Sequence, residues 1–273
     1  QRERGATCVW VASGGQLPSF GVMLQKFRAV TDAEAPPPTI AHRLAVQRAL
    51  VDVEVERAAA VVAEGREDSG PRAGAVFYQT LREFSQINEE VIEEEEEFLL
   101  LQHGGSAAAA TMASFMRLKE TVGRIRAFLS GSVALPVAAL PALPQRAFAD
   151  LVIFVHQQRA FIASLQATAP ASLLDLIQSG FNVDSAELAE VQWRLENDFD
   201  VYAIREALTV QRCWELYTSH VDKLRRIEVT LSDALQKEAQ AAQRVRAEAS
   251  AALFAAAKVL LEGRGPHSQD GAL

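Results

Sequence analysis

The chain has 273 residues, of which 49% are hydrophobic and 7% aromatic, enough apolar material for one large helical domain or two smaller bundles. The formal net charge of −8 argues against nucleic acid as the main partner, and any anion site has to be a local positive pocket. The scarcity of aromatic residues and the many alanines favour close-packed helices over a β-sandwich.

No segment has the pattern of a membrane span or a signal peptide. The purest apolar stretch, residues 151–155, is far shorter than the roughly 18 residues that a transmembrane helix needs. The sequence also lacks an initiator methionine. We therefore expect a piece of a longer protein that meets a membrane only through flanking segments.

Glycines and prolines divide the first half of the chain into helices. A first helix ends at Gly14 and Gly15, and a second begins at Pro18 and runs to about Asp32. Three further helices are expected over residues 39–65, 76–103 and 106–129, the last of them capped by Ser106.

The second half begins with a proline-rich stretch, residues 135–144, which we expect to be an extended apolar connector between two bundles. Helices are then expected over residues 145–167, after Pro170, over 184–197, and from about 201 to 262. No strand pattern persists, so the predicted fold is all-α.

The expected domains are a bundle at 1–134 that carries an anion site, a bundle at 135–235, and a projecting signalling helix with a disordered tail at 236–273. Beyond Gln236 the alternation of alanine and charge is too weakly apolar for a buried helix.

The usual catalytic and metal-binding patterns are absent from the sequence. Seven acidic residues within 89–97 would be spread around a helix, which is typical of a solvated face. None of the five histidines follows the Glu-x-x-His pattern of a di-iron bundle, and no G-x-S-x-G, P-loop or H-E-x-x-H motif occurs. We therefore expect a protein that is not an enzyme, with no metal and no cofactor.

Cys8 and Cys213 lie on apolar helical faces and are expected to be buried free thiols.

Two arginines on otherwise apolar helices are the remaining candidates for a site. Arg4 shares a face with Thr7, and Arg126 shares a face with Ser130; these two hydroxyls are candidate neutral donors. Each arginine alone is more typical of a surface position, but as a pair they would converge with no carboxylate evident between them. A buried unpaired guanidinium is costly, so such a site should hold an anion. Nitrate is planar and weakly hydrated, as guanidinium is, and suits the pair.

Four blocks of the sequence, in order, resemble the nitrate- and nitrite-sensing (NIT) family, an all-helical receptor module. The first is QRERGAT at residues 1–7, and the second is FRAVTD at 27–32. The third is residues 113–127, with Lys119, Glu120, Gly123 and Arg126 in register. The fourth is residues 214–228, where His220 stands at a position at which the family usually has arginine.

The resemblance implies two stacked up-down four-helix bundles with a long C-terminal connecting helix. It implies a sensor that binds nitrate or nitrite through Arg4, Arg126 and Thr7, with Arg194 as the best match to a third family arginine. A homodimer is implied, as is an output module in the same polypeptide, such as a nucleotide cyclase, histidine kinase, chemoreceptor or antiterminator. The receptor ectodomain is favoured over a cytoplasmic location. The alternative is a helical scaffold or coiled-coil interaction module without a small ligand.

Overall fold

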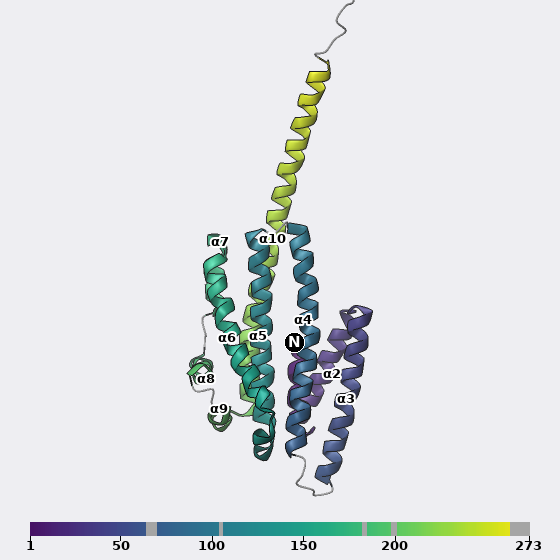
Figure 1. The fold of residues 1–273 in the computed structure, drawn as a ribbon, viewed down its shortest axis with the longest axis vertical. Coiled ribbons are helices and arrows are strands. Elements are labelled where there is room, and N and C mark those ends of the chain that lie inside the picture. The colour runs from purple at the N-terminus through teal and green to yellow at the C-terminus, as the bar shows by residue number, and fades with distance from the viewer. Residues whose placement is uncertain (64–69, 104–105, 182–184, 198–200, 263–273) are drawn as a thin grey trace, which may run out of the picture. The chain divides into compact units, whose positions relative to one another are not determined.

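The computed structural model describes residues 1–63, 70–103, 106–181, 185–197 and 201–262, and these residues form helices and their connections without a strand (Figure 1). The all-α prediction is therefore confirmed. The expected tail at 263–273 lies outside the described residues. The elements in chain order are α1 (Arg2–Ala12), α2 (Pro18–Ala33), α3 (Pro38–Ala63), α4 (Gly70–His103), α5 (Ala107–Ala134), the 3₁₀ helix η1 (Val137–Ala142), α6 (Gln145–Thr168), α7 (Ala171–Phe181), α8 (Ala186–Asn197), α9 (Val201–Ala207) and α10 (Val210–Glu262).

The chain divides into two compact units, one spanning Gln1–Val229 and one beginning at Thr230. The second unit contains the C-terminal part of α10, in which every side chain from residue 240 to 259 is exposed. Projection of this segment as a signalling helix stays a prediction. Among the helices that the structure describes, none is both long and apolar enough to span a bilayer.

The short helix α1 lies at the centre of the first unit. It packs against α2, α3, α4 and α5, and nine of its 11 residues are buried. The helix ends where the sequence predicts, because Gly14 (φ 57°) and Gly15 (φ 76°) adopt left-handed backbone conformations that favour glycine. Three polar side chains of this helix, those of Glu3, Arg4 and Thr7, are therefore buried from solvent.

The helix α5 is shared by both halves of the chain. It begins at Ser106, whose hydroxyl accepts from Ala109 N at 3.2 Å, as the predicted cap. It packs against α1 and α4 from the first half and against α6 and α9 from the second. Figure 1 shows α6 running alongside it. The expected boundary at 134–135 and the arrangement as two four-helix bundles stay predictions.

Two expectations about local structure are wrong. The proline-rich connector is not extended: residues 137–142 form a 3₁₀ helix, in which Leu143 N donates to Leu140 O at 3.1 Å. The fixed φ of proline fits this tight helix, and burial of Leu135 and Leu140 stabilises it. The final helix is also not continuous from residue 201, because α9 ends at Ala207 and α10 starts at Val210.

Candidate functional site

The structure buries both candidate arginines completely. The relative exposure of Arg4 on α1 is 1%, and that of Arg126 on α5 is 0%. They are the two largest fully buried side chains in the described part of the chain. A surface position is therefore excluded for each of them, and the desolvation of both guanidinium groups needs a physical reason.

Two glycines allow the arginines to meet where α1 and α5 pack together. A methyl group on Gly123 of α5 would lie 2.8 Å from Arg4 Nη2. A methyl group on Gly5 of α1 would lie 3.3 Å from Arg126 Nη2. Each helix thus leaves room beside its own backbone for the guanidinium of the other. This reciprocal packing places Arg4 and Arg126 at one α1–α5 contact, and the expectation that they share one anion pocket stays a prediction.

Arg4 has a carboxylate partner that the sequence interpretation did not foresee. Its Nη1 forms an ion pair with Glu120, which is also buried, and donates to Ser85 Oγ on α4 at 3.3 Å. Glu120 also accepts from Arg124 Nε at 3.0 Å and from Gln1 Nε2 at 2.9 Å. Although burial alone would raise it, Arg4 and Arg124 hold the pKa of Glu120 below its usual value. The expectation that no carboxylate lies at the site is therefore wrong for Arg4.

The other side of the Arg4 guanidinium is unpaired. Nε and Nη2 are both buried, and neither has an acceptor among the described residues. These two atoms form the edge with which arginine binds an oxyanion through two parallel hydrogen bonds. A buried donor without an acceptor costs about 1–3 kcal/mol, so an acceptor from outside the chain would stabilise this edge.

Arg126 is held by neutral groups. Its Nη2 donates to Gln1 O at 3.0 Å and its Nη1 to Thr218 Oγ1 at 3.3 Å, while the Trp214 ring centroid lies 4.6 Å from its Cζ. Its Nε has no acceptor, and no carboxylate lies within ion-pair distance of it in the described ranges. Burial, followed by the charge of Arg4, lowers the pKa of Arg126 to about 9. Asp222 and Glu120 act on it only from beyond ion-pair distance, so its positive charge has no direct partner among the described residues.

The arginine pair carries one positive charge without a carboxylate partner, and it has buried donors without acceptors among the described residues. Two buried guanidinium groups lie at the contact between α1 and α5: Arg4 is paired with Glu120, and Arg126 has no carboxylate within ion-pair distance among the described residues. An anion placed between them would supply both the missing charge and the missing acceptors. Within the described residues, no group of three or more histidine, cysteine, aspartate or glutamate side chains could hold a metal ion.

The two cysteines are buried free thiols, as predicted. Burial raises the pKa of Cys8 to about 12. It raises the pKa of Cys213 to about 12 as well. A thiol in such surroundings is protonated at neutral pH, so neither cysteine has the character of a nucleophile.

The other predicted site residues, Thr7, Ser130 and Arg194, have hydrogen-bond partners other than the two buried arginines. The Thr7 hydroxyl is buried one turn after Arg4 but donates to Glu3 O of its own helix at 2.8 Å. Ser130 Oγ lies 3.7 Å from Cys213 Sγ. Arg194 lies on α8, where Nε donates to Glu190 at 2.8 Å, and no described contact joins it to either buried arginine.

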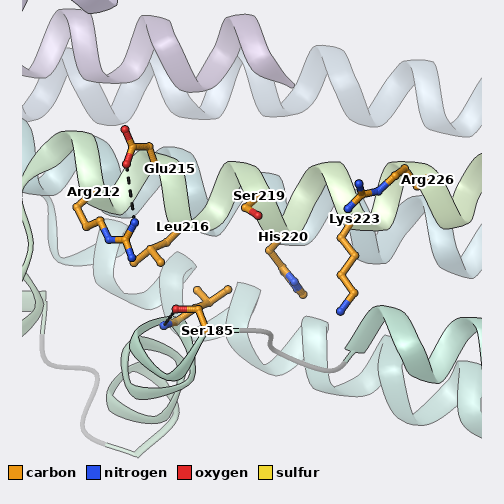
Figure 2. Close-up of a pocket in the computed structure, with 9 residues that line it drawn as sticks. Ser185, Arg212, Glu215, Leu216, Ser219, His220, Lys223 and Arg226 are labelled. Atoms are coloured by element: carbon orange, nitrogen blue, oxygen red, sulfur yellow. Dashed lines mark hydrogen bonds and ion pairs between the residues drawn. The ribbon is translucent and has the colours of Figure 1, made fainter.

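A cavity of about 380 Å³ lies along a face of α10 away from the arginine pair (Figure 2). Figure 2 shows His220 and Lys223 extending from α10 on the same side, and Arg212 and Glu215 form an ion pair earlier on the same helix. His220 is therefore part of this cavity lining, whereas Thr218, two residues earlier, contacts Arg126.

Three residues of the site were missed in the sequence. Glu120 has an arginine four residues later, a spacing that on its own indicates a surface ion pair. Ser85 precedes the acidic run of α4 and has no distinguishing pattern. Trp214 opens the fourth block that resembles the family, but that resemblance assigns it no role at the site. What places all three beside the arginines is the packing of α4 and α10 around α1 and α5, which periodicity does not predict.

Comparison with known proteins gives a family for most of the chain. The family model described as nitrate and nitrite sensing matches residues 1–236. None of the curated proteins compared with the chain matches it. Among solved structures, the chain is similar to the structure of the NasR transcription antiterminator, with 19% sequence identity and a TM-score of 0.43. The match covers 88% of this chain and 64% of that one, so this chain spans slightly less than two thirds of the NasR chain's length.

Proposed function

The chain belongs to the nitrate and nitrite sensing family, and we propose that it is a non-catalytic sensor domain that binds nitrate or nitrite between Arg4 and Arg126. The observation that carries this proposal is the unpaired Nε–Nη2 edge of Arg4, which is fully buried. That edge presents two parallel donors to two oxygens of one planar oxyanion.

The chemistry of the pair favours an anion of this type. Nitrate and nitrite carry one negative charge, which compensates the positive charge of Arg126. Guanidinium is weakly hydrated, so the pair loses less on desolvation than two ammonium groups would. Thr7 contributes in this proposal if its hydroxyl turns from Glu3 O to the anion.

Helix α10 is the proposed route by which occupancy is passed on. Arg126 contacts Trp214 and Thr218, which lie on this helix in the first unit, and the same helix continues to Glu262. An anion that binds the Arg126 guanidinium and shifts its position would therefore also shift its contacts with two side chains of α10. Because a ligand shifts an equilibrium only through its different affinities for two states, the bound and free states must differ in this contact.

The output module and the homodimer also belong to this proposal. We place the output module elsewhere in the same polypeptide, after α10. The exposed residues 240–259 include Val245, Leu253, Phe254 and Val259, which would pair with the same segment of a second copy. Small helix displacements at such an interface are a known means of signalling.

Thermal unfolding with increasing nitrate tests the sensor function. At 100 times the dissociation constant, a ligand that binds only the folded state adds about 2.7 kcal/mol to the free energy of unfolding. Nitrate and nitrite should therefore raise the melting temperature in a saturable way, with ionic strength matched by chloride.

The double variant Arg4→Ala/Arg126→Ala is the control, and it should show no nitrate-dependent shift. If the natural chain shows no shift at tens of millimolar nitrate, the sensor proposal is wrong and the helical scaffold without a small ligand is favoured. Isothermal titration calorimetry of the natural chain then gives the stoichiometry, which should be one anion for each chain.

A further inference from the structure

Asn88 on α4 carries a buried amide nitrogen that the fold does not use. Its Nδ2 is buried and has no acceptor among the described residues. Most buried polar groups in proteins are hydrogen-bonded, so an unpaired amide needs an explanation. Asn88 lies three residues after Ser85, whose hydroxyl accepts from Arg4 Nη1. Residues three apart are neighbours on one helix face, so Asn88 belongs to the face of α4 that meets Arg4.

Asn88 also lines a cavity that reaches the first three residues of the chain, next to Arg4. This cavity has a volume of about 490 Å³, and Gln1 and Lys119 line it too. Gln1 separates it from both arginines: its carbonyl accepts from Arg126, and its side chain donates to the carboxylate that pairs with Arg4. The cavity thus reaches to within one residue of two side chains that are buried from solvent.

Two of the cations that line this cavity are paired with carboxylates that line it too. Lys119 forms an ion pair with Glu228, and Arg2 forms one with Asp222. All four residues line the cavity. Because these cations have their own carboxylates, they offer an incoming anion little net attraction. A neutral donor such as the Asn88 amide adds a hydrogen bond without a further buried charge.

We infer that this cavity is the route by which the anion reaches the arginine pair, and that Asn88 is a further contact of the bound anion. The inference rests on the proposed function. The edge of Arg4 binds two oxygens, and the amide from the next turn of α4 donates to the third oxygen of nitrate or to a remaining lone pair of a nitrite oxygen. Chloride is a single spherical acceptor and gains less from donors that are spread over an oxyanion. Asn88 therefore raises the preference for nitrate or nitrite over chloride.

The test is Asn88→Leu, which keeps the size of the side chain and removes its donor. Calorimetric titration should show that the dissociation constant for nitrate rises about tenfold, as expected for one hydrogen bond to a charged group. The dissociation constant for chloride should change less than about twofold, because a single spherical ion bound at the Arg4 edge does not extend to the Asn88 amide. The melting temperature without nitrate should not fall, because an unpaired donor is removed.

Ser132→Ala is the matched control. Its Oγ is also buried and unpaired, but Ser132 does not line this cavity, so nitrate affinity should be unchanged. Asn88→Asp is a second variant of the same shape, and its carboxylate should weaken nitrate binding further. If the natural chain binds nitrate and both Asn88 variants bind it equally well, the inference is overturned while the proposed function stands. If the natural chain does not bind nitrate, both are overturned.

Discussion

Gly123 lies against the guanidinium of Arg4, so close that a methyl group at this position would be 2.8 Å from Nη2. Both residues are buried, and the guanidinium is held on its other side by Glu120. The glycine therefore fixes where the unpaired edge of Arg4 can lie. A larger side chain at Gly123 is therefore expected to disturb the position of the Arg4 guanidinium more than the packing of the hydrophobic core.

Gly123→Ala should accordingly reduce nitrate affinity more than stability. The added methyl group displaces the tip of a flexible side chain, so the expected loss of stability is about 1–2 kcal/mol, at the lower end for overpacking. The dissociation constant for nitrate should rise about tenfold or more, because Nη2 leaves its position. Titration calorimetry and thermal unfolding measure the two effects on the same sample.

Gly131→Ala is a matched overpacking control on the same helix. Its methyl group would lie 2.1 Å from Phe77 Cε2, so this variant should lose stability without a specific loss of nitrate affinity in the fraction that is folded. If Gly123→Ala binds nitrate as the natural chain does, the proposed position of the anion beside Nη2 is wrong.

Arg126→Lys should bind nitrate poorly although it keeps the positive charge. An ammonium group cannot reproduce the planar fork, and it loses the stacked arrangement on Trp214. Losing one charge-assisted hydrogen bond costs about 1.5–3 kcal/mol, which is about a ten- to hundredfold rise in the dissociation constant. Arg159→Lys, at an exposed ion pair with Glu196, is the control and should leave nitrate binding unchanged. Equal affinity of Arg126→Lys and the natural chain would contradict a planar two-donor contact.

Glu120 should make the domain sensitive to acid. Its pKa in the folded chain is lowered from an ordinary value of 4.5, so the unfolded chain takes up a proton at a higher pH than the folded one. The stability that the ion pair with Arg4 contributes is thus present above pH 4.5 and is lost as the pH falls through the lowered folded value. Thermal unfolding between neutral and acidic pH measures this loss.

The variant Glu120→Gln isolates that contribution. It leaves Arg4 buried without a counter-charge, so at neutral pH the free energy of unfolding should fall by about 3 kcal/mol. Its stability should also depend less on pH below 4.5 than that of the natural chain. An unchanged acid dependence in the variant would mean that other carboxylates are responsible.

Arg194→Ala should change nitrate affinity by less than about twofold. Arg194 is partly exposed on α8 and forms an ion pair within its own helix, and exposed pairs of this kind contribute about 0.3–0.5 kcal/mol to stability. Titration of this variant with nitrate checks the point directly. A loss as large as that expected for Arg126→Lys would instead make Arg194 the third anion-binding arginine.

The sequence predicts the parts of this site that depend on local pattern. Arg4 and Arg126 stand out because they interrupt apolar helical faces, and Gly5 and Gly123 stand out because glycine is unfavourable in a helix without a packing reason. The carboxylate partner of Arg4 could not be predicted in this way. The family resemblance places Glu120 in register, but its pairing with Arg4 follows only from which face of α5 is covered by α1, and that depends on the packing of several helices together.

The same division holds for the fold. Gly14 and Gly15 predict the end of α1, and Ser106 predicts the start of α5, because caps and left-handed positions act within a few residues. The connector at 135–144 was predicted wrongly, since its conformation depends on burial of Leu135 and Leu140 against the rest of the unit. Proline content alone excludes an α-helix there but does not distinguish an extended chain from a 3₁₀ helix.

Removal of every residue after Gln236 tests the proposed relay. The family match ends at residue 236 and the first compact unit at Val229, so the shortened chain keeps Arg4, Arg126 and their contacts. Residues 240–259 are exposed along their whole length, and removing exposed residues should lower the free energy of unfolding by less than about 1 kcal/mol. Nitrate affinity should also be kept, whereas the self-association of the longer chain, measured by analytical ultracentrifugation, should be lost. If the shortened chain unfolds, this segment is part of the core and the relay proposal is wrong.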